Sequence, residues 1–214
     1  GTILTSTNGT SWTKRTSGTS EDLWGVAYAD GLWVATGGSG TILTSPDGTS
    51  WTSRTSGTSE DLRGVAYANG FWVATGLSGT ILTSPDGTSW TKRTSGTSED
   101  LRGVAYANGL WVAVGLSGTI LTSPDGTSWT SRSSGTSENL RGIAYANGLW
   151  VAVGYSGTIL TSTNGTSWTK RTSGTSEDLW GVAYADGLWV ATGGSGTILT
   201  SPDGTSWTSR TSGT

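Results

Sequence analysis

Residues 1–39 read GTILTSTNGTSWTKRTSGTSEDLWGVAYADGLWVATGGS, and the chain repeats this unit almost unchanged along its length. The unit restarts at Gly40, Gly79, Gly118 and Gly157. A period of this size is typical of stacked or circular repeat proteins, because one such unit cannot bury its own apolar face. The sequence therefore predicts a single repeat domain over residues 1–214, with units 1–39, 40–78, 79–117, 118–156 and 157–195 and a half-unit 196–214.

A second, longer repeat lies within the first. Residues 157–214 copy residues 1–58 letter for letter, and one position alternates strictly between Lys and Ser (Lys14, Ser53, Lys92, Ser131, Lys170 and Ser209). Such near-identity indicates either a recent amplification or a deliberately built sequence, and both origins stay open. The chain begins at Gly1, inside a repeat, which fits a segment of something longer.

The composition indicates a globular β protein with a core built on aromatic rings. Only 33% of the residues are hydrophobic, but 13 Trp and 6 Tyr recur at fixed positions. Cys and His are absent, so neither a disulfide framework nor a thiolate metal site is possible. The net charge of −3 provides no basic stripe for nucleic acid, and no run approaches the ~20 apolar residues that span a membrane. We expect neither nucleic acid nor a membrane as a partner, and no localisation is predicted.

The third unit shows the pattern of strands and turns most clearly. Residues 80–83 and 90–94 are short β-favouring runs on either side of a Pro-Asp-Gly turn. Residues 101–107 (LRGVAYA) and 110–114 (LWVAV) are largely apolar, and Asn108-Gly109 between them is a strong hairpin signal. The unit is therefore predicted to form four short antiparallel strands.

Four strands in about 40 residues are typical of one β-propeller blade. The predicted fold class is an all-β propeller of four-stranded antiparallel blades, with the two apolar strands of each blade near the axis. The alternative architecture is a β-solenoid with two short coils per unit. The alternation of apolar and polar strands favours the propeller.

The turn at Ser45–Trp51 (SPDGTSW) resembles a shortened Asp-box, the turn of sialidase-type and related bacterial β-propellers. The motif is one residue short, and two units carry Thr-Asn in place of Pro-Asp, at Thr7-Asn8 and Thr163-Asn164. The resemblance implies a turn between the third and fourth strands of a blade. It also implies a blade order with the inner strand from Leu23, the second from Leu32, the third from Gly40 and the outer strand from Trp51.

The repetition argues against an enzyme, because catalysis needs different groups around one reacting atom. The loop acids Glu21, Glu60, Glu99, Glu138 and Glu177 are interpreted as solvated loop residues rather than as a catalytic pair. Sialidases need an arginine cluster, a tyrosine and an acid from unlike blades, so no catalytic residue is assigned. The turn acids Asp47, Asp86, Asp125 and Asp203 lack the further oxygen ligands that calcium requires. We expect no metal and no cofactor.

Two columns of the repeat vary substantially between units. One reads Trp24, Arg63, Arg102, Arg141 and Trp180, and the other reads Gly38, Leu77, Leu116, Tyr155 and Gly194. In a propeller both columns fall on one face of the disc, close to the central channel. Trp occurs with Gly, whereas Arg occurs with Leu or Tyr, which predicts direct contact between the columns. Their large side chains are the candidate ligand-binding residues: Trp can stack on sugar faces or protein partners, and Arg can bind carboxylates. The alternative is packing drift at the channel mouth.

The strand count predicts an incomplete ring. The chain holds five inner pairs of strands but six outer pairs, so we expect five complete blades plus a surplus outer hairpin. An unpaired hairpin exposes its edges, which predicts completion by another copy, as a strand-exchanged oligomer or a shared ring. The predicted function is a non-enzymatic scaffold that closes or assembles through its terminal half-blade. The alternatives are a multivalent, lectin-like module that binds glycans and, third, a sialidase-type enzyme.

Overall fold

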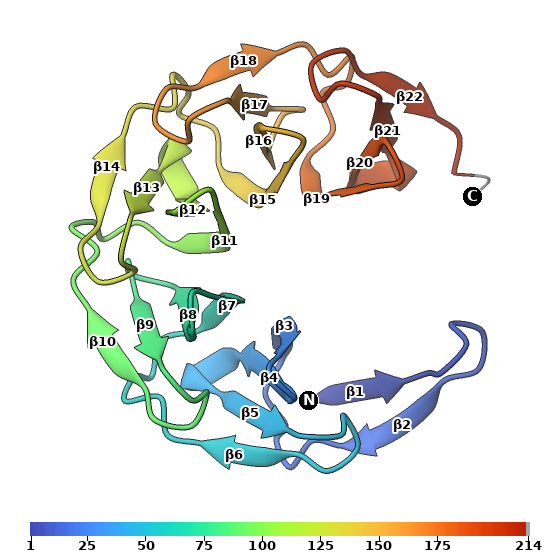
Figure 1. The fold of residues 1–214 in the computed structure, drawn as a ribbon. Helices are drawn as coiled ribbons and strands as arrows, with labels where there is room; N and C mark the ends of the chain where they lie inside the picture. Colours follow the sequence, from blue (N-terminus) through green and yellow to red (C-terminus); the bar gives the residue numbers. More distant parts are fainter. Residues whose placement is uncertain (213–214) are drawn as a thin grey trace.

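The computed structural model describes residues 1–212 and forms an open arc of small antiparallel sheets (Figure 1). Five sheets have four strands and one sheet has two. The fold is an all-β propeller, with five complete blades and one extra outer hairpin as predicted. In the described residues no helix is long and apolar enough to cross a membrane.

The strands recur in the same order in every unit. The extra hairpin consists of β1 (Thr2–Thr5) and β2 (Thr13–Thr16). The innermost strands are β3 (Leu23–Ala29), β7 (Leu62–Ala68), β11 (Leu101–Ala107), β15 (Leu140–Ala146) and β19 (Leu179–Ala185). The second strands are β4 (Leu32–Gly37), β8 (Phe71–Gly76), β12 (Leu110–Gly115), β16 (Leu149–Gly154) and β20 (Leu188–Gly193). The third strands are β5 (Ile42–Ser45), β9 (Ile81–Ser84), β13 (Ile120–Ser123), β17 (Ile159–Ser162) and β21 (Ile198–Ser201). The outer strands are β6 (Thr52–Arg54), β10 (Thr91–Arg93), β14 (Thr130–Arg132), β18 (Thr169–Arg171) and β22 (Thr208–Arg210).

Each blade is a simple meander whose strands run from the inside of the arc to its outer edge (Figure 1). The blade order implied by the Asp-box resemblance is therefore confirmed, with strand starts shifted by one or two residues. A tight turn joins the two inner strands, and in the third unit Asn108 and Gly109 adopt φ angles of 50° and 75°. Both values lie in the left-handed region, which matches the right-handed twist of a two-residue hairpin. Short 3₁₀ turns follow three of the second strands: η1 (Gly38–Gly40), η2 (Leu116–Gly118) and η3 (Gly194–Gly196).

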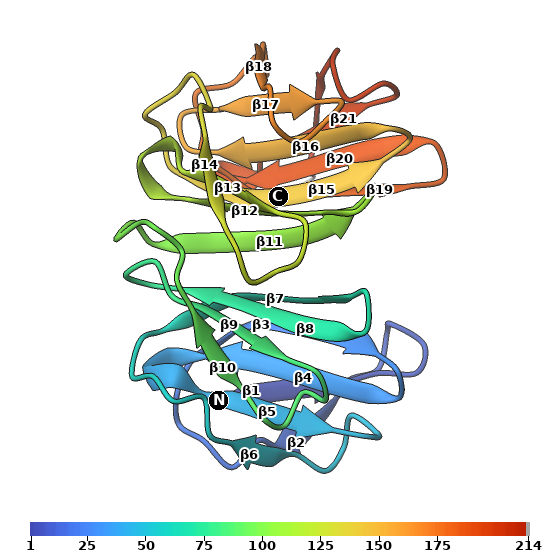
Figure 2. The same ribbon diagram turned by 60° about the vertical axis from the view of Figure 1, so that its left-hand side comes forward.

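The hydrophobic core is divided among the interfaces between blades. At each of four interfaces, Val and Ile of one blade pack on Leu, Trp, Ala and Leu of the next. Trp150 is typical: its side chain is 1% exposed and lies against Val112 and Val114 of the preceding blade. The sheets are stacked face to face around the arc (Figure 2), so every blade needs a neighbour to cover its apolar faces.

The arc does not close into a ring, because the β1–β2 hairpin and the β19–β22 blade do not meet (Figure 1). All the large hydrophobic side chains with high exposure lie in the hairpin, the first blade or the last blade. These side chains are Leu4, Trp12, Trp24, Val26, Tyr28, Trp180 and Leu188. The unburied apolar surface is thus concentrated at the two ends of the repeat array.

The polar turn between the third and outer strands is held by its own side chains. In the fourth unit, the Oδ1 atom of Asp125 accepts the backbone N–H groups of Thr127 at 2.9 Å and Ser128 at 2.8 Å. The hydroxyl of Ser123 accepts the N–H of Gly126 at 2.8 Å. Asn164 of the next unit makes the same two backbone contacts through its amide oxygen. The turn therefore needs an oxygen acceptor rather than a charge.

The tryptophan on the second strand of each blade gives a stability prediction, with the tryptophan of the first blade as its control. Trp150→Ala leaves a cavity in a complete interface and should cost about 3–5 kcal/mol of unfolding free energy. Trp33→Ala removes the equivalent ring from the first blade, where that ring is already partly exposed, and should cost roughly 1–2 kcal/mol. Urea unfolding followed by far-ultraviolet circular dichroism measures both values. Equal losses would show that the end interface is as well packed as the internal ones.

The turn predicts an acid-dependent stability. Backbone hydrogen bonds, that from Ser128 first, hold the pKa of Asp125 well below its ordinary value of about 3.9. Because the folded-state pKa is depressed, this contribution is complete above the unfolded pKa and is lost as the pH falls below about 4. Asp125→Asn should keep the unfolding midpoint at pH 7 and weaken its dependence on acid, whereas Asp125→Ala should lower the midpoint at both pH values. Thermal unfolding between pH 2.5 and pH 7 measures these midpoints. If Asp125→Asn unfolds at pH 7 at as low a temperature as Asp125→Ala, the prediction is wrong.

Candidate functional site

The first variable column lies on a β-bulge at the start of each innermost strand. In the second blade the pairing shifts between Leu62 and Gly64, so Arg63 is the extra residue of the bulge. The same shift places Trp24, Arg102, Arg141 and Trp180 at equivalent bulges. A bulge redirects the side chain that it carries. The repeat position that varies most in chemistry between units therefore lies where the bulge turns the side chain away from the regular strand pairing.

The second variable column lies directly beside the first. The backbone N–H of Leu77 donates to the carbonyl of Asp61 at 2.9 Å, and the same contact recurs in the other units. The predicted contact between the columns is found in the fourth unit, where the guanidinium of Arg141 donates to the hydroxyl of Tyr155. At the two glycines of the second column, an added Cβ atom on Gly38 would lie 3.5 Å from the ring of Trp24, and one on Gly194 would lie 3.7 Å from that of Trp180.

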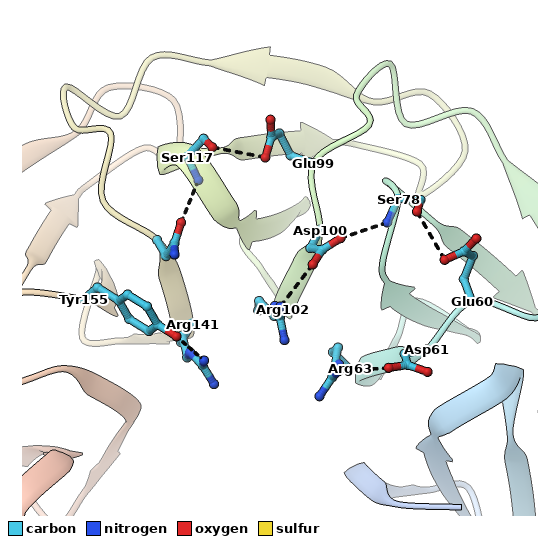
Figure 3. Close-up of polar contacts among 11 residues, drawn as sticks. Glu60, Asp61, Arg63, Ser78, Glu99, Asp100, Arg102, Ser117, Arg141 and Tyr155 are labelled. Carbon is cyan, nitrogen blue, oxygen red and sulfur yellow. Dashed lines mark hydrogen bonds and ion pairs between the residues drawn. The ribbon is translucent and has the colours of Figure 1, made fainter.

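The three arginines lie side by side on the inner rim and point into the open centre of the arc (Figure 3). Arg63 donates to Asp61 at 2.9 Å, and Arg102 donates to Asp100 at 3.0 Å. Asn139 stands two positions before Arg141, where the other two units have Asp61 and Asp100, and within residues 1–212 the Arg141 guanidinium forms no ion pair. The rim therefore carries two paired cations and one that lacks a carboxylate.

The electrostatics of the rim reflect this crowding of positive charge. Burial, and then the positive charge of Arg102, lowers the pKa of Arg63, while Asp61 acts in the opposite direction. The guanidinium stays protonated at neutral pH because its ordinary pKa exceeds 12. Arg63 also lies 3.5 Å above the ring of Trp24 from the preceding blade, a cation–π contact across the blade interface.

The inner parts of the arginine side chains are buried. The Nε atoms of Arg63, Arg102 and Arg141 have no hydrogen-bond partner within the described residues. The guanidinium groups point towards the centre of the arc, where Arg63 and Arg102 donate to aspartates and Arg141 donates to Tyr155. A row of partly exposed guanidinium groups is suited to carboxylate-bearing or other anionic ligands.

The aspartate contact of the rim joins neighbouring blades, and the glutamates bind a serine of their own blade. The Oδ1 atom of Asp100 accepts the backbone N–H of Ser78 from the preceding unit at 3.1 Å, and Glu60 accepts the hydroxyl of Ser78 at 3.2 Å (Figure 3). All five glutamates accept such a hydroxyl. These glutamates lie in exposed loops, and each also holds the loop between the second and third strands of its own blade. Sequence reasoning missed the contact because the serine lies in a different loop.

No metal centre is found in the described part of the chain. Within residues 1–212, no three side chains of His, Cys, Asp or Glu gather in a group that could hold an ion. The carboxylates of the turn acids Asp47, Asp86, Asp125 and Asp203 bond to backbone N–H groups of their own turns instead.

Comparisons with known proteins agree on the architecture. No family model matches the chain, and no curated protein matches it. Among solved structures, YCF48 from Cyanidioschyzon merolae is 17% identical, with a TM-score of 0.66 over 86% of this chain and 67% of that protein. YCF48 bound to a D1 peptide is 21% identical, with a TM-score of 0.72 over 94% of this chain and 71% of the other. The computationally designed protein Ika8 is 14% identical, with a TM-score of 0.67 over 83% of this chain and 57% of Ika8. All three are β-propellers, and at these identities the likeness concerns the fold alone.

Proposed function

We propose that this protein is a non-enzymatic repeat scaffold that assembles by packing its two end faces against further copies of itself. The observation that carries the proposal is the concentration of exposed apolar side chains at the two ends of the arc. The near-identity of the units supports a non-enzymatic role, because equivalent blades do not create an asymmetric reaction centre. The turn at Ser45–Trp51 supports kinship with the Asp-box propellers.

The C-terminal end face is the uncovered side of the last blade. Leu188 is 40% exposed, and Val190 and Ile198 are partly exposed. Their equivalents inside the array are better covered: Val151 and Ile159 are fully buried against the following blade. The last blade thus presents the same apolar surface that every internal blade presents to its neighbour.

The N-terminal end face supplies part of the complementary surface. Leu4 is 50% exposed, whereas its equivalent Leu43 is 1% exposed, and Trp12 is 59% exposed. Inside the array, the leucine equivalent to Leu188 reaches the turn glycine of the next blade, as Leu149 does at Gly204. A second copy would offer Leu4, Trp12 and the turn at Gly9 to Leu188 of the first. This contact is heterologous, so it produces either a closed ring or a filament.

The assembly proposal predicts a mass above that of one chain. At micromolar concentrations, light scattering coupled to size-exclusion chromatography should give a mass larger than 21.9 kDa. Leu188→Glu places an unpaired charge in the end contact and should return the protein to a single chain. The exposed outer-strand variant Ser53→Glu adds the same charge away from both ends and should leave the mass unchanged.

A mass of one chain at every concentration, with both termini resistant to proteolysis, would overturn the assembly proposal. An assembly that Leu188→Glu and Ser53→Glu leave equally intact would also overturn it, because the end faces would then not be the contact.

A second candidate function is supported by the arginines of the inner rim. We propose that Arg63, Arg102 and Arg141 bind an acidic glycan in a lectin-like manner. Trp24 and Trp180 flank the arginines. The ring of Trp180 and the face of Trp24 that Arg63 does not cover would provide stacking surfaces for sugar rings, while Leu77, Leu116 and Tyr155 would line the approach. Because Arg141 forms no ion pair within residues 1–212, it is the position best able to accept an added carboxylate. Several weak sites on one rim would gain avidity from their number.

Charge-matched variants test the glycan proposal. Replacing Arg63, Arg102 and Arg141 by Ala should reduce binding to an array of acidic glycans by at least about tenfold, since each charge-assisted contact contributes roughly 1.5–3 kcal/mol. Replacing Lys14, Lys92 and Lys170 by Ala removes the same number of charges from exposed outer strands and should leave binding unchanged. Equal binding by both variants, with the circular dichroism spectrum retained, would rule out a role for the rim arginines.

A further inference from the structure

We infer that the half-blade at the N-terminus is a binding site for a β-hairpin, one with the chemistry of this chain's own inner strand pairs, supplied by another molecule. The inference goes beyond the assembly of copies, because it concerns a different occupant and the cavity between the β1–β2 hairpin and the first blade, which shares Leu4 and Trp12 with the end contact. It rests on a cavity, a free strand edge and the repeated structure of the chain itself.

The cavity lies between the β1–β2 hairpin and the first complete blade. It has a volume of about 520 Å³ and is lined mainly by apolar groups, among them Ile3 and Leu4 of β1, Leu23 and Val26 of β3, and Trp33 of β4. Val26 is 62% exposed, whereas the equivalent Val65 packs against the core of its interface. Leu23 is partly exposed, although Leu62, Leu101, Leu140 and Leu179 are fully buried. The cavity therefore lies where an interface between blades lacks one of its two sides.

The missing side can be identified from the complete interfaces. Between the first and second blades, Ala27, Ala29, Leu32 and Val34 of one blade face Leu62, Val65 and Trp72 of the other. The first group belongs entirely to an inner strand pair. An occupant of the cavity must therefore present small and branched apolar side chains in alternation on both strands of a hairpin, as Ala105, Ala107, Leu110 and Val112 do in the third unit.

The free edge of β1 determines how the occupant pairs. In every complete blade the third strand pairs on both sides, but within the described residues β1 pairs only with β2. In the first blade, Val34 is opposite Thr44 and Ala35 is opposite Leu43. The same register would place a Val opposite Thr5 and an Ala opposite Leu4. Backbone hydrogen bonds along this edge would give affinity, and the apolar cavity would give selectivity.

Copies of this chain cannot complete the half-blade without leaving another one incomplete. Each copy has five inner pairs, all paired with outer hairpins, and six outer hairpins. Residues 1–212 therefore contain one outer hairpin more than inner pairs. The occupant must bring an inner-type hairpin that these five blades do not already use.

The test uses the full chain and a synthetic peptide with the sequence of residues 101–115, LRGVAYANGLWVAVG, carrying a fluorophore. Fluorescence anisotropy should show saturable binding at one site per chain, and a scrambled peptide of the same composition should not bind. Val26→Glu alters an exposed side chain in the cavity and should weaken binding at least tenfold. Leu188→Glu alters an exposed apolar residue at the other end and should leave peptide binding unchanged.

A covalent form of the same test avoids the poor solubility of apolar peptides. Residues 101–117 joined ahead of Gly1 continue the repeat without a break and should form a sixth complete blade. We expect the melting temperature to rise by several degrees and the added segment to resist proteolysis. An unchanged melting temperature together with rapid cleavage of the added segment would overturn the inference.

Two further outcomes separate this inference from the assembly proposal. Loss of higher mass in Leu188→Glu with retained peptide binding supports both proposals. If the protein does not bind the peptide, and if Val26→Glu lowers the mass of the assembly to that of one chain, then a second copy fills the cavity. That result would overturn the hairpin inference alone.

Discussion

The whole structure depends on the face-to-face contact between consecutive blades. Each contact joins Val and Ile of one blade to Leu, Trp, Ala and Leu of the next, and no blade contains enough apolar surface to form a core alone. Trp150 is buried because a complete preceding blade covers it, and Trp33 is partly exposed because only the β1–β2 hairpin precedes its blade. Stability, assembly and binding at the ends are therefore three consequences of one repeated interface.

The rim is shaped by how closely the innermost strands approach each other. A Cβ atom placed on Gly103 would lie only 2.9 Å from the carbonyl oxygen of Arg141, so a side chain at this position would push the blades apart. The glycine after each bulge lets neighbouring backbones meet, and the bulge residue before it turns towards the centre. The arginines are crowded on one rim as a direct result of this close approach. The buried Nε atoms and the lowered pKa of Arg63 reflect that crowding.

The repeat and its turns predicted the fold well, because they are local features of the sequence. The 39-residue period, the Asn108-Gly109 turn and the apolar run 101–107 fixed the blade, its strand order and the surplus hairpin. The bulge at Arg63 could not be predicted, since it depends on the register between two strands. The bonds from Ser78 to Asp100 and Glu60 were also missed, because they join loops that are distant in the sequence. The variation within the columns did point to the rim, but not to the pairing of Arg63 with Asp61 or the lack of an ion pair at Arg141.

The identity of the units explains why the ends differ from the middle even though their sequences do not. Val26 and Val65 occupy equivalent positions, yet one is largely exposed and the other packs into a core. A side chain in this chain acquires its role from its position in the array. The first and last blades of residues 1–212 therefore present apolar side chains that the internal blades bury, although the sequences of these blades are equivalent.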